Sequence, residues 1–226
     1  MGVVAVRSKI AIALSIFLLL MSSNLSPVSA DTKGKKGYPN SEEVVCIDEP
    51  VEANAKVSKR VALPKKLLKR APRLIELITN CGVITIRPEF NDAPIAVTFM
   101  SSLIQQKYFD QTTCHRLTTE VTSFIQCGDP TGTGMGDKVF TYQKENLPKR
   151  FGRYRQGTVA IQNRDGISSQ FLMFYEDTTL SPNHSVWGKV VDGIEILEFI
   201  AEGGIEGGST DGKPVRILVI ERAVIR

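Results

Sequence analysis

The stretch at residues 114–136, CHRLTTEVTSFIQCGDPTGTGMG, decides how the rest of this chain is interpreted. It begins with two short segments, 114–117 and 123–127, in which apolar and polar residues alternate. Such alternation is typical of half-buried strands, and the short stretch between them predicts an antiparallel hairpin. Arg116 and Gln126 then lie on neighbouring strands and share one face. That face offers a rigid cationic fork, an amide and an adjacent apolar surface.

The glycine-rich end of this stretch, residues 128–136, has two interpretations. Its glycines alternate with other residues as in some nucleotide-binding loops, but the Gly-Lys-Ser/Thr ending is missing. The residues that follow, 139–142, have the character of a strand, whereas a nucleotide-binding loop leads into a helix. We therefore predict an irregular loop with positive backbone angles, and we assign no nucleotide.

Three ordered blocks resemble the cyclophilin family of peptidyl-prolyl isomerases. The first is the stretch above, and the others are GTVAIQN at 157–163 followed by SQF at 169–171, and HSVWGKVVDG at 184–193. The resemblance covers residues 73–224 and is strongest to exported actinobacterial members. It implies a mainly β fold, a closed eight-stranded antiparallel β-barrel capped by two α-helices, with a substrate groove outside.

The residues themselves agree with a mainly β fold, because many short strand-like runs accompany two isolated helical patterns. Pro94 can stand in the first turn of one helix, and a second helical pattern from Ile194 ends at Gly203 and Gly204. The last apolar run, 215–220, is predicted to be a central strand of the barrel.

The resemblance also implies which residues act on a substrate. Arg116 matches the family's catalytic arginine, and Gln126 matches the glutamine that orients the arginine and the substrate. Without the surrounding blocks, Arg116 would be interpreted as an ordinary surface arginine and His184 as a surface histidine. The residues that match substrate-binding positions are Phe124, Asn163, Gln170, Leu172, Leu180 and His184.

The predicted reaction needs no covalent chemistry, cofactor or metal. Rotation about an X-Pro bond faces a barrier of about 20 kcal/mol that comes from amide resonance. A catalyst need only hold the proline ring and donate a hydrogen bond to the prolyl nitrogen as it becomes pyramidal. A guanidinium is suited to this role because it is always charged and its donors form a fixed fork.

The predicted pocket departs from the family pattern. Ser123 and Phe124 stand where the family usually has phenylalanine and methionine, Gln162 replaces a small alanine, and Leu172 replaces a second phenylalanine. We expect an apolar pocket that binds proline, and cyclosporin-like ligands, more weakly. The alternative function is therefore a catalytically weak chaperone or proline-peptide binding module that keeps the fold.

The N-terminal segment of the chain indicates export. In residues 1–30, Arg7 and Lys9 precede an apolar run at 10–21, and small residues close the segment, as in a secretory signal peptide. An uncleaved anchor is the alternative, but the run is shorter than the ~20 residues that span a bilayer. We predict a signal peptide at 1–30, a basic, proline-containing linker or stalk at 31–72 and the isomerase domain at 73–226. The protein is then extracellular or associated with the cell surface, or an uncleaved segment retains it at the membrane.

One part of the linker, residues 59–73, contains seven basic residues and no acidic residue, interleaved with Val61, Leu63, Leu67 and Leu68. The favoured interpretation is a solvated basic linker, because prolines restrict any helix to a short piece. The alternative is a surface that binds anionic wall polymer, lipid headgroups or an acidic client.

Composition and cysteine content set the remaining limits. The chain has 226 residues, 42% of them apolar, and a net charge of +4, which is too small to indicate nucleic acid. We expect a monomer whose partners are proline-containing polypeptides.

The four cysteines allow three complete pairings. Cys114 and Cys127 lie on the two arms of the hairpin, which leaves Cys46 for Cys81; four unpaired thiols are the alternative, and no C-x-x-C pair indicates zinc.

Overall fold

The computed structural model describes residues 43–47, 61–136, 143–149, 151–162 and 169–226. The predicted signal peptide at 1–30, the predicted strand at 139–142 and the candidate residue Asn163 lie outside these ranges. No helix within the described ranges is both long enough and apolar enough to cross a membrane.

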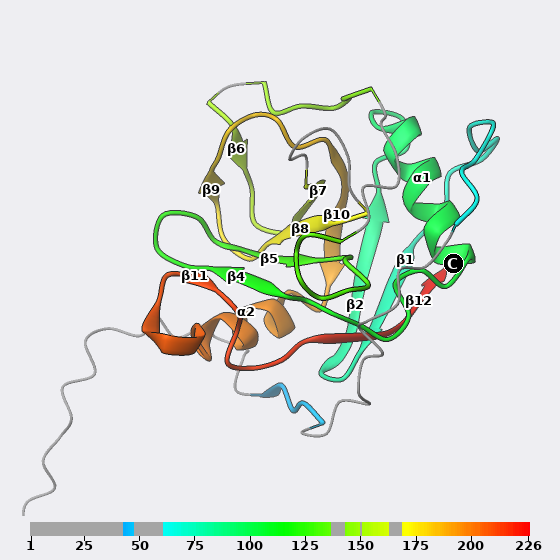
Figure 1. Ribbon diagram of the computed structural model, residues 1–226. Helices are drawn as coiled ribbons and strands as arrows, with labels where there is room; N and C mark the ends of the chain where they lie inside the picture. Colours follow the sequence, from blue (N-terminus) through cyan, green and yellow to red (C-terminus); the bar gives the residue numbers. More distant parts are fainter. Residues whose placement is uncertain (1–42, 48–60, 137–142, 150, 163–168) are drawn as a thin grey trace, which may run out of the picture. The chain divides into compact units, whose positions relative to one another are not determined.

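Short strands are the commonest regular element of the described chain, and they are accompanied by two α-helices and one 3-10 turn (Figure 1). The elements are β1 (Ile75–Thr79), β2 (Gly82–Pro88), α1 (Pro94–Gln105), β3 (Thr112–Thr113), β4 (Arg116–Thr118), β5 (Phe124–Cys127), β6 (Arg153–Tyr154), β7 (Thr158–Ile161), β8 (Phe171–Phe174), β9 (Thr178–Thr179), β10 (Val186–Asp192), α2 (Ile194–Glu202), η2 (Glu206–Gly208), β11 (Asp211–Gly212) and β12 (Val219–Ile225). The predicted mainly β fold with two helices is confirmed.

The main sheet is antiparallel and curled, with the strand order β11-β4-β5-β8-β7-β10-β2-β1-β12-β3. Its closure and strand count differ from the prediction of eight strands in a closed barrel. The ladder contains ten strands and ends at β11 and β3, and β6 and β9 form a separate two-stranded sheet.

The two sides of this sheet meet at the segment that contains β3 and β4. Cys114 N donates to Leu218 O beside β12, whereas the next residue, His115, donates to Gln126 O in β5. One continuous segment therefore pairs with β12 through its first half and with β5 through its second half. The predicted strand at 114–117 corresponds to β4, which begins at Arg116, and β3 precedes it as a separate strand.

The two helices begin and end where the sequence predicts. Pro94 occupies the first turn of α1, where its missing N–H costs no helical hydrogen bond. Gly193 caps the start of α2 with a positive φ of 85°, and a Cβ at this position would lie 2.5 Å from Val83 O, so a larger residue would clash there. α1 contacts β10 and β12, and α2 contacts β2.

The prediction of a central strand at 215–220 is wrong in its bounds, because β12 begins at Val219. The preceding residues pair with α2 and its C-terminal turn: Val215 N donates to Gly204 O, and the guanidinium of Arg216 lies 3.8 Å from the Phe199 ring. Val215 and Ile217 are therefore partly exposed rather than central. An apolar run indicates that a segment tends to be buried, but it does not show which element the segment packs against.

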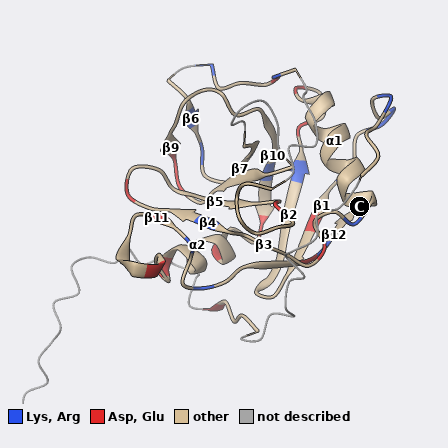
Figure 2. Ribbon diagram, viewed as in Figure 1, with Lys and Arg blue, Asp and Glu red and all other residues tan. Residues whose placement is uncertain are grey.

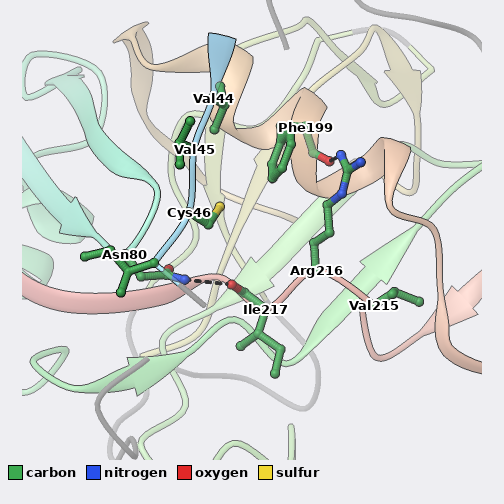
Figure 3. Close-up of a pocket in the computed structure, with 9 residues that line it drawn as sticks. Val44, Val45, Cys46, Asn80, Phe199, Val215, Arg216 and Ile217 are labelled. Carbon is green, nitrogen blue, oxygen red and sulfur yellow. Dashed lines mark hydrogen bonds between the residues drawn. The ribbon is translucent and has the colours of Figure 1, made fainter. Parts of the chain in front are cut away.

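Both predicted disulfides are present, Cys46–Cys81 and Cys114–Cys127. The first fixes residues 43–47 beside the β1–β2 turn, where Ile47 N also donates to Asn80 O. A cavity of about 480 Å³ lies between this segment, Phe199 and residues 215–217 (Figure 3). None of the candidate substrate-binding residues lines it.

Candidate active site

Two apolar surfaces lie on opposite faces of strands β5, β7 and β8, because successive side chains of a strand point to opposite faces. Ile125, Met173 and Val159 belong to the main core. The opposite face carries a smaller cluster, which we call the outer cluster: Phe124, Tyr154, Ala160, Leu172 and Phe174, with Leu180 and Val186 packed against it. Strands that are buried on both faces show little alternation, which is why the outer cluster is hard to recognise from sequence.

Arg116 and Gln126 lie at the border of the outer cluster. They are direct partners in the β4–β5 ladder, and Arg116 Nη1 donates to Gln126 Oε1 over 3.0 Å. The guanidinium carbon of Arg116 lies 5.2 Å from the centre of the Phe124 ring. The predicted shared face is confirmed, and the cationic fork lies above an aromatic surface.

Gln170 extends this contact into a chain of hydrogen bonds. Gln126 Nε2 donates to Gln170 Oε1 over 2.5 Å, and Gln170 Nε2 donates to Gly134 O over 3.2 Å. Both glutamines are buried, so their amide orientations are determined by these partners. The structure thus brings three of the predicted site residues together.

The glycine-rich loop that supplies Gly134 has the irregular form expected of it. Gly128, Gly132 and Gly134 all have positive φ, as predicted. The carboxylate of Asp129 accepts hydrogen bonds from Thr131 N and Gly136 N. Burial raises the pKa of Asp129, but the hydrogen bonds from Thr131 and Gly136 outweigh it and lower the pKa below its ordinary value. The charged carboxylate therefore holds the loop that presents Gly134 O to Gln170.

Asp211 is a site residue that the sequence did not reveal. Strand β11 pairs with β4 and places the Asp211 carboxylate against Arg116, with Nε–Oδ1 at 2.6 Å and Nη2–Oδ2 at 2.7 Å. Its hydrogen bond with Arg116 lowers the pKa of Asp211. This two-pronged contact occupies one edge of the guanidinium and leaves Nη1 directed at Gln126. The two residues are 95 positions apart, so no local pattern predicts it.

His184 lies at the far side of the outer cluster, beside Tyr154. Its Nδ1 is 3.1 Å from Ile161 O, and because a carbonyl oxygen only accepts, Nδ1 carries the proton. Burial lowers the pKa of His184 below its ordinary value. The ring is therefore neutral at pH 7 and suits the wall of an apolar pocket. Tyr154 and Phe174, which stack with ring centres 4.6 Å apart, were not predicted as part of this site.

Ser123, one of the departures from the family pattern, faces neither Arg116 nor the outer cluster. Its backbone N–H donates to Thr178 Oγ1, and its hydroxyl donates to Glu176 Oε2. Phe124 therefore supplies the aromatic surface in this part of the site. No group of His, Cys, Asp and Glu side chains able to hold a metal occurs in the described part of the chain.

Residues 74–224 match the family described as cyclophilin type peptidyl-prolyl cis-trans isomerase/CLD. The chain belongs to the cyclophilin family. Among curated relatives, probable peptidyl-prolyl cis-trans isomerase B of Mycobacterium tuberculosis is 35% identical over 165 residues, which cover 67% of this chain and 54% of that protein. The protein of the same description from Mycobacterium leprae is 35% identical over 159 residues, or 64% of this chain and 54% of that one. This cyclophilin thus spans about half the length of the curated relatives it matches.

Solved cyclophilin structures support the fold. A cyclophilin type isomerase of Cryptosporidium parvum has a TM-score of 0.59 at 24% identity, covering 69% of this chain and 98% of that one. The crystal structure of that isomerase in the presence of the dipeptide Ala-Pro has a TM-score of 0.58 to this chain. At this identity the likeness shows the fold alone.

Leu172 has no exposed surface in this cyclophilin, although its position suggested contact with substrate. It pairs with Gln126 on one side and Ala160 on the other, within the outer cluster. Restoring the family's phenylalanine with Leu172→Phe should therefore overpack the cluster and lower the free energy of unfolding by about 1–3 kcal/mol. Urea denaturation measures this, with Leu172→Met as the volume-conserving control. A variant as stable as the wild type would mean that the cluster has room for the larger ring.

Proposed function

We propose that this cyclophilin is a peptidyl-prolyl cis-trans isomerase that acts on X-Pro bonds of proteins folding outside the membrane. The observation that carries the proposal is the position of Arg116. Its fork is held by Asp211 and Gln126 at the border of an apolar cluster, where a proline ring and a hydrogen-bond donor are needed together. The 35% identical mycobacterial relatives, which are named as isomerases, support it.

In this proposal Arg116 donates a hydrogen bond to the prolyl nitrogen in the transition state. That nitrogen gains basicity only as the amide twists, so the bond stabilises the transition state more than the substrate. Gln126 orients the guanidinium. The proline ring packs against Phe124 and Leu180, with Leu172 beneath them and His184 at the far wall. Gln170 lines the groove, and Asn163 binds the residue that precedes proline, as the family resemblance implies. Accelerating the rotation by about 10⁵ requires roughly 7 kcal/mol of such differential stabilisation.

The exported location is part of the proposal. Two disulfides support it, because such bonds persist mainly in oxidising compartments. We also propose that the protein acts as a monomer and binds cyclosporin-like ligands weakly, since the cluster has Leu172 where the family pattern has an aromatic ring.

The test is NMR exchange spectroscopy on a blocked X-Pro peptide with the oxidised protein. We expect catalytic amounts to accelerate cis-trans exchange well beyond the unaided rate, which takes tens to hundreds of seconds. Peptide shifts without acceleration would support the alternative function, a binding module or chaperone. That alternative is favoured by one observation: Phe124 is 3% exposed and Leu172 is fully buried, so little of the outer cluster is open in the structure.

We predict that Asp211 positions Arg116 for this reaction. In Asp211→Ala the guanidinium of Arg116 loses both bonds to the carboxylate and keeps its contacts with Gln126 and Phe124. We therefore expect kcat to fall about fivefold, the equivalent of an exposed ion pair of ~1 kcal/mol, with little change in KM. Asp211→Asn retains an acceptor oxygen, so its kcat should fall less than that of Asp211→Ala. Because its pKa is lowered, the wild-type contact should persist until the pH falls below the ordinary aspartate value.

The matched control for Asp211 is Glu206→Ala. Glu206 forms a 2.6 Å ion pair with Lys213 close to β11, and its side chain is as exposed as that of Asp211, but its ion-pair partner is not Arg116. Loss of activity in both variants would assign the effect to the loop as a whole and not to the guanidinium.

A further inference from the structure

The basic loop, residues 61–73, is not used by the proposed isomerase reaction. Five exposed cations occur along it: Lys65, Lys66, Lys69, Arg70 and Arg73. Two large apolar side chains are exposed among them, Leu63 at 45% and Leu67 at 52%. The question is whether this segment is a solvated linker or a surface with a function.

Hydrogen bonds hold the basic loop against α1. Ala62 N donates to Gln106 Oε1 over 2.7 Å, and Gln106 Nε2 donates back to Ala62 O over 2.9 Å. Further along, Leu68 N donates to Thr98 Oγ1 over 3.1 Å, and Val61 packs against the main core. The segment is therefore attached to the domain at three points, and it does not have the free backbone of a flexible linker.

The charge of the basic loop is balanced neither by α1 nor by an ion pair among the described residues. Helix α1, against which it lies, contains no charged residue. Among the described residues, no ion pair involves any of the five cations. Figure 2 shows the loop as a blue segment beside the uncharged ribbon of α1. A positive surface of fixed shape is thus presented to solvent.

The combination of cations with exposed leucines distinguishes between anionic partners. A soluble polyanion can form ionic contacts with the lysines and arginines, but it offers no apolar phase in which Leu63 and Leu67 can be buried. An anionic bilayer provides both interactions, because the apolar side chains enter its interface while the cations contact the headgroups. We propose that the basic loop docks this protein onto anionic lipid surfaces, independently of its isomerase site.

The test measures partitioning of the full chain into vesicles of phosphatidylcholine alone and with phosphatidylglycerol. The readout is the ratio of anionic to neutral partitioning, since residues 1–30 are the same in every variant. Each cation near an anionic surface contributes about fivefold, so Lys65→Gln with Lys66→Gln should lower the ratio roughly 25-fold. The control, Lys189→Gln with Lys213→Gln, removes the same charge elsewhere and should leave the ratio nearly unchanged.

A second variant separates a lipid surface from a soluble polyanion. Leu63→Ser with Leu67→Ser should lower partitioning into anionic vesicles roughly tenfold and leave binding to heparin unchanged. An unchanged ratio in the lysine variant would overturn the proposal. If the leucine variant partitions like the wild type, the loop binds polyanions by charge alone, and the lipid surface is excluded as its specific partner. Isomerase activity should be equal in all variants, so a failure here leaves the proposed function intact.

Discussion

Replacing Arg116 with alanine should lower kcat for X-Pro isomerisation by about 10²–10³-fold, the usual effect of removing one preorganised donor from a transition state. The side chain is one-third exposed and is not part of either apolar cluster, so the fold should remain intact. Exchange spectroscopy measures the rate, and circular dichroism with thermal unfolding verifies the fold. The loss should appear in kcat more than in KM, because the prolyl nitrogen accepts strongly only in the transition state.

Arg116→Lys is the informative companion to the alanine variant. It keeps the positive charge but loses the planar fork that contacts Asp211 and Gln126 at once. We expect it to recover little of the lost rate. Full activity in the lysine variant would show that charge alone is sufficient, and full activity in a folded Arg116→Ala would remove the arginine from the mechanism.

Removing the Cys114–Cys127 disulfide should cost about 3 kcal/mol of unfolding free energy, the chain-entropy value for a loop of this length. The cysteines are 13 positions apart and flank the hairpin that carries Arg116 and Gln126. Both are fully buried, so alanine is the substitution that introduces no polar group. Urea denaturation of Cys114→Ala with Cys127→Ala measures the loss. We also expect kcat to fall, because the hairpin holds Arg116 and Gln126, the proposed catalytic pair, in register.

The other disulfide provides the comparison. Cys46→Ala with Cys81→Ala releases residues 43–47, which contact neither Arg116 nor the outer cluster, so its kcat should equal that of the wild type. Equal losses of kcat in both double variants would show that activity follows global stability and not the geometry of the hairpin.

Short-range features of this fold could be predicted from the sequence. The hairpin and the pairing of Arg116 with Gln126 follow from two alternating segments joined by a short turn, where register has little freedom. Pro94 and Gly193 similarly determine where their helices begin. The pairing of Cys114 with Cys127 follows from the hairpin itself.

Long-range features could not be predicted in this way. Alternation shows which residues share a face, but not which distant element covers that face. The outer cluster needs Tyr154 and Phe174, which come from different strands, and Phe124 and Leu172 become buried only because these strands meet. The start of β12 at Val219, rather than at residue 215, depends on contacts of the preceding residues with α2 and its C-terminal turn, which are also long-range.

The sequence by itself determined the mainly β class, the hairpin with its Cys114–Cys127 pair and the face that Arg116 shares with Gln126, because each depends on residues close together in the chain. Only the tertiary structure decided that Asp211 holds the arginine, that β3 and β4 have different partners, and that the basic loop is attached to an uncharged helix. These contacts join segments tens of residues apart, and packing in three dimensions selects them among many partners that the same local pattern allows.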